Sequence, residues 1–316
     1  MKKKLFICKG LVLNTLCAYL LMSIWGCAVT PKPMTSIKNI PGSFDKGTII
    51  STQTGQPVSF ENFLVDLSRV RVVYIGETHT NQSHHDIQLR VIKELFKKHS
   101  GLSVGMEMFD RSYQPILDLW AAGKLDQDTF LKKAHWYANW RFDFDLYRGI
   151  LDFIKAQHIA LVGLNIPFHI PPRIAVGGIE NLSDADRAYV PAEINTSDTA
   201  HRAYLKEVFS HHRIRGREDF ENFYMTQCVW EEVMAESVAL NMKEHPMVVL
   251  AGNGHIVQKF GIPNRAFRRT GDAFRTVLLV SAGNESERSA ADYIWVTPAG
   301  MPHFHGTMPG KFRPPS

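Results

Sequence analysis

Six short apolar runs are the feature that most constrains the fold, because most of them are followed by a turn or a helical stretch. They are residues 72–75, 102–106, 159–164, 248–251, 274–280 and 293–296. Continuous apolar strands that alternate with helices are typical of a parallel sheet with both faces covered. The sequence therefore predicts an α/β fold, with a mainly parallel sheet flanked by helices.

The strand pattern also divides the chain. Residues 46–298 form the predicted α/β body, and residues 177–245 within it have helical periodicity, many charges and no strand signal. We expect this span to be a small inserted helical subdomain. Residues 27–45 are rich in Pro, Ser and Thr, which predicts a tether. Residues 299–316 are rich in Gly and Pro, which predicts a loose tail.

The N-terminus has the pattern of a secretory leader. A basic start precedes an apolar run at residues 11–25, which is short for a membrane span. Gly26 and Cys27 then resemble the bacterial lipoprotein box, in which the cysteine is acylated and becomes the new N-terminus. We therefore predict a signal peptide at residues 1–26 and lipidation of Cys27, with an uncleaved membrane anchor as the alternative. Ala28 favours the outer membrane of a bacterial cell envelope.

Charge and cysteine content exclude two classes of protein. The chain has 36 Lys and Arg against 31 Asp and Glu, but four of the lysines lie in the leader, leaving 32 against 31. A nucleic-acid-binding body would need a concentrated basic face, so no nucleic-acid partner is predicted. Cys8 and Cys17 leave with the leader and Cys27 is acylated, so Cys228 has no partner for a disulfide in the predicted mature chain.

Polar residues follow four of the apolar runs. Glu77 and His79 follow the first run, Glu107 the second, Asn165 the third and His255 the fourth. In open parallel sheets, ligands bind beyond the carboxyl ends of the strands, where such residues meet. We therefore expect these side chains to lie close together.

Two carboxylates and two imidazoles at one sheet edge suit two kinds of chemistry. His79, His255 and Glu107 have the ligand types for a divalent metal with an open position for water. Alternatively, an imidazole acts as a general base while a carboxylate such as Glu77 fixes its tautomer. Arg141 would pair with the acids or hold an anionic ligand group. The structural alternative is that these groups only cap strands and helices.

The same residues resemble a known family. The segment Gly-Glu-Thr-His-Thr-Asn-x-x-His-His-x-x-Gln-Leu at residues 76–89 is similar to the signature of ChaN-like haem-binding lipoproteins. Further matches cover residues 46–296 in order: Glu107-Met108-Phe109, Gln114, Trp140, Tyr147, Asn165-Ile166-Pro167, Gln227, Trp230, Met234-Ala235, residues 251–256 and residues 261–263. The family is related to a wider group that includes erythromycin esterases and the Tiki metalloproteases.

The resemblance implies a parallel sheet with a smaller helical subdomain, and non-covalent haem binding in haem or iron uptake at the cell envelope. Covalent c-type attachment is excluded, because the sequence has no Cys-x-x-Cys-His motif. An outer-membrane haem transporter is an expected partner. The chain departs from the family at Phe168, where members often have a basic residue that would contact an anion.

Haem needs an apolar slot, an axial ligand and partners for its propionates. The insert offers aromatic and basic residues at high density, and our candidates for the iron ligand or the propionate contacts are Tyr204, His211, His212 and Tyr224. The structural alternative is that Phe220, Phe223 and Tyr224 form the core stripe of the insert. A flat ligand with two faces can bridge protomers, so a haem-dependent homodimer is also predicted.

Two other functions remain open. The cleft constellation of Glu77, His79, Glu107, Arg141 and His255 would serve a periplasm-facing hydrolase, either with a metal or through a metal-free base. The chain would otherwise be a non-catalytic lipoprotein that binds a partner. We predict a haem-binding lipoprotein on a hydrolase-like body, with haem near the cleft mouth or the helical insert.

Overall fold

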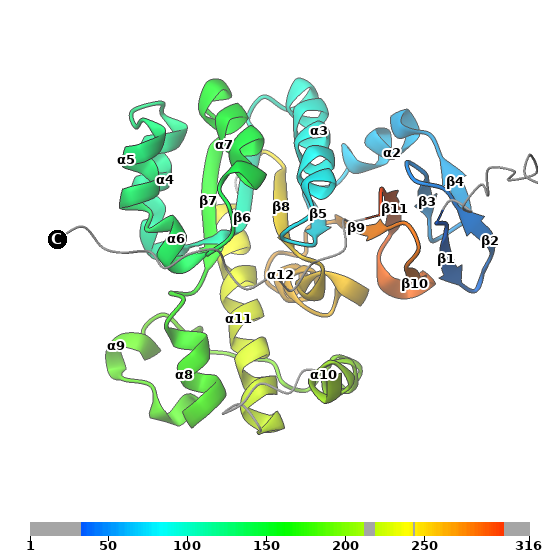
Figure 1. Cartoon of the computed structure of the whole chain (residues 1–316). Helices are drawn as coiled ribbons and strands as arrows, with labels where there is room; N and C mark the ends of the chain where they lie inside the picture. The colour runs from blue at the N-terminus through cyan, green and yellow to red at the C-terminus, as the bar shows by residue number, and fades with distance from the viewer. Residues whose placement is uncertain (1–32, 212–218, 243, 300–316) are drawn as a thin grey trace, which may run out of the picture. The chain divides into compact units, whose positions relative to one another are not determined.

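The computed structural model describes residues 33–211, 219–242 and 244–299 (Figure 1). The predicted leader, Cys27, His212 and nearly all of the predicted tail lie outside these residues. Among the described residues, no helix is both long and apolar enough to cross a membrane.

An eight-stranded sheet forms the centre of the α/β body, and all six predicted strands belong to it. The strand order is β4-β3-β11-β9-β5-β8-β6-β7, with the neighbours from β11 to β7 all parallel and β3 antiparallel to both β11 and β4. The strands are β3 (Ile49–Ser51), β4 (Gln56–Val58), β5 (Val72–Glu77), β6 (Ser103–Asp110), β7 (Ala160–Asn165), β8 (Met247–Gly252), β9 (Phe274–Ser281) and β11 (Tyr293–Thr297). The predicted α/β class is confirmed.

The central strands are apolar throughout because both faces of the sheet are covered. Every residue of β5 and β8 is buried. Val73 and Ile75 pack into one core layer, whereas Val72 and Tyr74 pack into the layer on the opposite face. Side chains alternate between the faces of a strand, so a strand covered on both sides cannot show the polar alternation of a half-exposed one.

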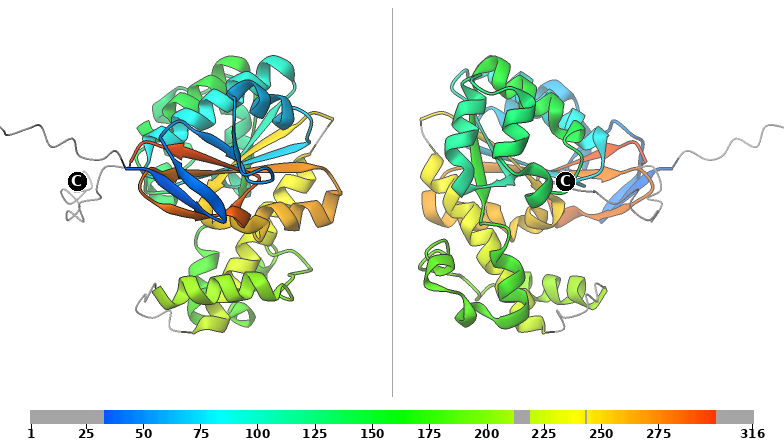
Figure 2. Two further views of the ribbon diagram at one scale, coloured as in Figure 1. Left: turned by 90° about the vertical axis from the view of Figure 1, so that its right-hand side faces the viewer. Right: turned by 60° about the vertical axis from the view of Figure 1, so that its left-hand side comes forward.

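Helices cover the sheet on both sides (Figure 2). One face carries α2 (Phe60–Leu67), α3 (Gln82–Lys98), α4 (Gln114–Ala121), α5 (Gln127–Lys133), α6 (Trp136–Asn139) and α7 (Asp145–Gln157). The other carries α12 (Ile262–Thr270) and the C-terminal part of α11 (Phe220–Asn241). Helix α2 begins after Ser59, whose side chain accepts a hydrogen bond from the Asn62 N–H.

The described part of residues 177–245 is helical, as predicted, but the boundaries of the subdomain differ. Besides α11 it contains α9 (Asp184–Arg187) and α10 (Thr199–His211), and α8 (Ile170–Gly177) joins it from before residue 177. Ile170 and Ile174 pack against Val229 and Val233 of α11. The C-terminal part of α11, in contrast, packs on the sheet through Met234 and its neighbours, so this helix belongs to both parts.

The predicted tether is wrong over residues 35–44, which form two strands. β1 (Thr35–Lys38) pairs antiparallel with β2 (Ile40–Phe44) and parallel with β10 (Glu285–Glu287). The physical reason is hydrophobic: Ile37 and Ile40 are buried in a cluster with residues of β9 and β11. Two isoleucines within a polar stretch are enough to fix this short segment on the body.

Candidate functional site

The sheet brings four of the predicted site residues together. Glu77 is the last residue of β5 and lies opposite Gly252, the last residue of β8. Glu107 lies in β6, on the other side of β8. A short 3₁₀ helix, η3 (Asn253–His255), follows β8 and carries His255. The carboxyl ends of three adjacent strands therefore supply both acids and both imidazoles, as predicted.

Glu77 and His79 form the first pair. The Nδ1 atom of His79 lies 2.9 Å from Oε1 of Glu77. That oxygen also accepts a hydrogen bond of 2.6 Å from the Tyr147 hydroxyl, and Oε2 accepts one of 2.9 Å from Gln88. Burial alone would raise the pKa of Glu77, but hydrogen bonds from His79 and His85 hold it well below its usual range. Glu77 is therefore a buried, ionised anchor for His79.

The turn that carries His79 is itself held by two further histidines. Nδ1 of His84 accepts a hydrogen bond from the Thr78 N–H, at 2.9 Å, and Nε2 of His85 lies 3.1 Å from the His79 carbonyl oxygen. Burial lowers the pKa of His84 to about 4, so this ring is neutral at pH 7. Both rings are buried in α3, and their contacts identify them as supports of the turn.

Glu107 and His255 form the second pair. Oε1 of Glu107 lies 3.5 Å from Nε2 of His255, and Oε2 accepts a hydrogen bond of 2.6 Å from the Gly252 N–H. On its other side, Nδ1 of His255 lies 3.4 Å from Oε1 of Glu231. Burial alone would lower the pKa of His255, but the charges of Glu107 and Glu231 raise it overall.

The two pairs meet around Gly252. A Cβ atom at this residue would lie 3.2 Å from Nε2 of His79 and 3.6 Å from Oε2 of Glu107. Burial alone would lower the pKa of His79, but its hydrogen bond to Glu77 and the charge of Glu107 raise it overall. The His79 side chain is 28% exposed and that of His255 is 12% exposed, so solvent reaches both imidazoles. The absence of a side chain at Gly252 allows this close approach.

Aromatic rings fix the orientation of both imidazoles. The His79 ring lies 4.8 Å from the ring of Trp140 and 5.1 Å from that of Phe142. The His255 ring lies 5.2 Å from that of Trp230. Trp230 in turn donates a hydrogen bond to Asn165, whose side-chain amide donates to the Glu107 carbonyl oxygen. Asn165 therefore links the third strand end to the site, as its position after a strand predicted.

A cavity of about 490 Å³ lies next to these imidazoles. It is lined by residues of α6 and the loop after it, of α8 and its preceding turn, and of α10 and α11: Ala138, Asn139, Arg141, Phe168, His169, Pro171, Pro172, Ala175, Phe209, Phe223, Thr226, Gln227 and Trp230. Trp230 is shared with the His255 environment, and the Phe168 ring lies 6.2 Å from that of Trp140, which contacts His79. The cavity and the imidazoles therefore share aromatic walls.

Arg141 lines this cavity and has an unusual backbone. Its φ angle is 70°, in the left-handed region that a residue with a side chain seldom adopts. The residue is exposed, and its guanidinium forms no ion pair with a carboxylate in the described ranges. Of the two roles predicted for Arg141, pairing with the acids of the site is not observed among the described residues, and holding an anionic ligand group stays a prediction. Its position at the cavity leaves the charge available for an anionic ligand group.

Comparison with known proteins assigns the chain to a family. The model of the family described as haem-binding uptake, Tiki superfamily, ChaN matches residues 63–266, which is more than half of the chain. The chain belongs to the ChaN family. The predicted resemblance is thereby confirmed, and membership of a haem-binding family supports haem binding.

Two solved structures resemble this ChaN-family chain to different degrees. A structure of ChaN from Campylobacter jejuni, described as showing cofacial haem binding, has a TM-score of 0.64 and 20% identity, and the match covers 78% of this chain and 95% of that one. A mutant of the erythromycin esterase EreC has a TM-score of 0.48 and 12% identity, over 83% and 99% of the two chains. The first match shows the fold. A search of curated protein sequences finds no match.

The predicted haem ligands of this ChaN-family member lie away from the cavity. Tyr224 is buried in the helical part, and its hydroxyl donates a hydrogen bond of 2.9 Å to the Thr196 carbonyl oxygen. Tyr204 is half-buried, with its ring 6.0 Å from that of Phe260. His211 is exposed at the end of α10. None of these three lines the cavity, and His212 lies outside the described residues.

The predicted metal ligands His79, His255 and Glu107 lie together. Within the described ranges, however, no group of three or more His, Cys, Asp or Glu side chains is arranged to hold a metal ion. The metal site stays a prediction.

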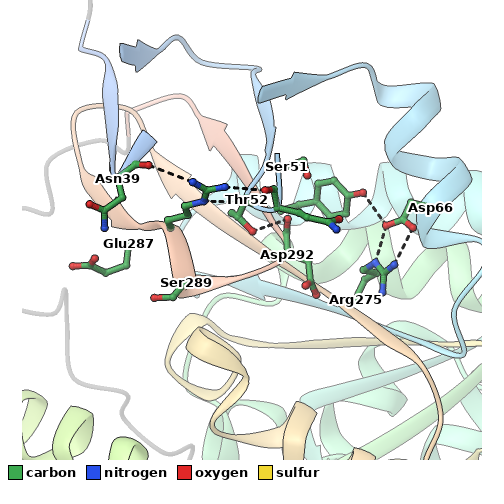
Figure 3. Close-up of a pocket in the computed structure, with 11 residues that line it drawn as sticks. Asn39, Ser51, Thr52, Asp66, Arg275, Glu287, Ser289 and Asp292 are labelled. Atoms are coloured by element: carbon green, nitrogen blue, oxygen red, sulfur yellow. Dashed lines mark hydrogen bonds and ion pairs between the residues drawn. The ribbon is translucent and has the colours of Figure 1, made fainter. Parts of the chain in front are cut away.

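A second cavity, of about 770 Å³, lies at the other end of the sheet (Figure 3). Its charged side chains are already paired: Arg275 contacts Asp66, and Arg288 donates hydrogen bonds to the carbonyl oxygens of Thr52 and Gln53. None of the described residues predicted for the site lines it. We therefore assign this cavity no part in the site.

One contributor to the site was missed from the sequence, and two entered without a role. Glu231 lies in the middle of α11, with no strand end or motif to mark it. Gln88 and Tyr147 entered only as matches to the family, although both donate hydrogen bonds to Glu77. Site residues at strand ends can be recognised from the sequence. Site residues on the helices that cover the sheet can be recognised only from the tertiary structure.

Proposed function

We propose that this chain binds haem non-covalently in the cavity beside His79 and His255, as a lipid-anchored protein of the cell envelope in haem or iron acquisition. The observation that carries the proposal is this cavity in a member of a haem-binding family. Its aromatic walls include Phe168, Phe223 and Trp230, which suit a flat apolar macrocycle. When bound, haem would supply an iron centre that a protein side chain can ligate.

Arg141 is the residue that we assign to a haem propionate. An exposed guanidinium without an ion pair offers two parallel hydrogen bonds to a carboxylate. Family members often have a basic residue at the position of Phe168, which in this chain is an apolar wall of the cavity. Arg141 would supply the positive charge in its place. The neighbouring Arg173 is already paired with Asp186.

Haemin titration of the full chain in detergent tests the proposal. We expect a shifted Soret band, and an affinity about tenfold weaker for Arg141→Ala, because one charge-assisted contact contributes about 1.4 kcal/mol. Arg69→Ala is the matched control, since Arg69 is exposed after α2 and lines neither cavity. A wild-type chain with no Soret shift, or equal losses in the two variants, would contradict the proposal.

The same titration with His79→Ala and His255→Ala locates the haem relative to the imidazoles. Loss of the shifted band in either variant supports a position against the cleft. Full retention in both variants would place haem elsewhere, in the helical part or at its surface.

The envelope location depends on Cys27. We expect labelled palmitate to be incorporated into the natural chain and not into Cys27→Ser, and the chain to fractionate with the outer membrane. A chain that keeps residues 1–26 after expression would contradict cleavage at this cysteine. An outer-membrane haem transporter is the partner that this location suggests, and co-purification with haemin present tests it.

A haem-dependent homodimer is the proposed assembly. Sedimentation with and without haemin measures it, and a monomer that haemin leaves unchanged would count against it. Neither outcome affects the assignment of the cavity.

Hydrolysis at the cleft is the second candidate function. The observation in its favour is that each imidazole is held by a buried carboxylate, with Gly252 between the two pairs. Such an arrangement suits a general base. We expect turnover of a chromogenic ester to fall by roughly 10²–10⁴ in His79→Ala or His255→Ala. Sensitivity to chelation would support the metal-dependent form, and a wild-type chain without turnover would contradict hydrolysis of that ester.

A further inference from the structure

Glu231 is a buried carboxylate that reaches the site from α11, a helix that also builds the helical subdomain. We propose that Glu231 is a positioning residue for His255, holding the imidazole proton on Nδ1 so that Nε2 faces Glu107 and the cleft. The inference deepens the hydrolytic role proposed for the cleft, and rests on that role only for its effect on turnover.

The geometry around the His255 ring separates its two nitrogens. Nδ1 lies 3.4 Å from Oε1 of Glu231, in an arrangement that satisfies hydrogen-bond geometry. Nε2 lies 3.5 Å from Oε1 of Glu107, which is ion-pair distance only. The other oxygen of Glu107 is occupied by the Gly252 N–H. Glu231 is therefore the better acceptor for a ring proton, and Nε2 is the nitrogen with its lone pair toward the cleft.

Glu231 is itself held in place from two other elements. Its Oε2 atom lies 3.3 Å from Nε of Arg265, in α12, and 3.4 Å from Nε2 of His201, in α10. All three side chains are almost completely buried. A buried cation next to a buried carboxylate offsets the cost of burying its charge and fixes its position.

Gly261 makes room for this contact. A Cβ atom there would lie 2.9 Å from Oε1 of Glu231 and 2.3 Å from the His255 carbonyl oxygen. The backbone before α12 therefore packs against the Glu231 carboxylate and the main chain of His255. Trp230, the preceding residue of α11, packs its ring on His255 and limits rotation of the imidazole.

Charged groups face His255 from every element packed around it. Glu107 comes from β6, Glu231 from α11, His79 from the turn after β5 and His201 from α10, with Arg265 behind Glu231. Glu107 and Glu231 are the acids among them, and they lie on opposite sides of the ring. Because Nδ1 donates its proton to Glu231, Nε2 faces the cleft and is available for proton transfer or for binding a ligand.

The placement of the proton is measured without haem or substrate. Long-range ¹⁵N–¹H correlation of labelled histidine distinguishes the two neutral tautomers, and the His255 signals are assigned from His255→Gln. We expect the Nδ1–H form for neutral His255 in the natural chain. In Glu231→Gln we expect a mixture of tautomers, and ester turnover reduced by roughly 10².

Glu236→Gln is the matched control, because it makes the same change on the same helix, at a residue paired with Arg111 near the surface. It should leave the His255 tautomer unchanged. If Glu231→Gln does not fold because Arg265 keeps only Glu232 as a carboxylate partner, the double variant Glu231→Gln with Arg265→Met serves instead, since Arg268 and Arg269 still pair with Glu232.

The outcomes separate the two proposals. An Nε2–H tautomer in the natural chain, or an unchanged tautomer without the Glu231 carboxylate, would overturn the positioning role. An Nδ1–H tautomer that depends on Glu231, in a chain without ester turnover, would support the positioning role while the proposed hydrolysis fails.

Discussion

Removing the Tyr147 hydroxyl tests the buried anchor of the site most directly. In Tyr147→Phe, Oε1 of Glu77 loses its hydrogen bond of 2.6 Å and retains only the contact with His79. Both side chains are buried, so water cannot replace the lost donor. A hydrogen bond to a charged group contributes about 1.5–3 kcal/mol, and we expect the free energy of unfolding to fall by about 2 kcal/mol.

Urea unfolding at pH 7 measures this loss, with an unchanged m-value as the sign that the unfolded state is the same. The thermal midpoint should fall by roughly 4–8 °C for a domain of this size. The matched control is Tyr293→Phe, whose hydroxyl donates a hydrogen bond of 2.8 Å to Asp66. Asp66 is 26% exposed and is also held by Arg275, so we expect a loss of about 1 kcal/mol or less.

Equal losses in the two tyrosine variants would refute the reasoning, because burial of the carboxylate is what distinguishes them. So would a loss below about 0.5 kcal/mol in Tyr147→Phe, which is the range of ordinary surface substitutions.

Three further predictions follow from single residues. Buried His84 has a pKa of about 4 against 6.5 in the unfolded chain, so its stabilisation is present above pH 6.5 and is lost as the pH falls toward 4. Urea unfolding at the two pH values measures the effect. Between pH 7.5 and pH 5 the free energy of unfolding should fall by about 2 kcal/mol less in His84→Gln than in the natural chain, and an equal fall in both proteins would contradict the prediction. Gly252→Ala should displace the His79 ring and lower stability by about 1–3 kcal/mol, whereas Gly254→Ala, where no described atom lies within 4 Å, should have little effect. Burial raises the pKa of Cys228 to about 11, so iodoacetamide at pH 8 should modify this thiol only after unfolding, as peptide mass spectrometry would show; rapid labelling of the native chain would contradict its burial.

Much of the candidate site was predictable because its members lie at strand ends. Glu77, His79 and His255 follow apolar runs directly, and neighbouring parallel strands bring their carboxyl ends to one edge. Arg141 lines the cavity and pairs with none of the described acids. The direction of its side chain depends on the left-handed backbone between Trp140 and Phe142, which the sequence does not indicate.

The helical subdomain shows what composition leaves open. The aromatic residues of α10 and α11 were weighed as haem contacts, but Tyr224 lies in the core of the subdomain itself. Phe223, one residue earlier, lines the cavity. Adjacent residues of a helix point about 100° apart, so which of them faces a ligand depends on how the helix is rotated against its neighbours.

The sequence by itself determined the parallel sheet and the main polar residues of its edge, because continuous apolar runs and the residues that end them are local features. Only the tertiary structure decided that Glu231 lies behind His255 and that Tyr147 lies behind Glu77. Both come from helices far along the chain, and their contacts arise from the packing of those helices on opposite faces of the sheet. No local pattern records that packing, because the same helical periodicity fits many rotations and offsets.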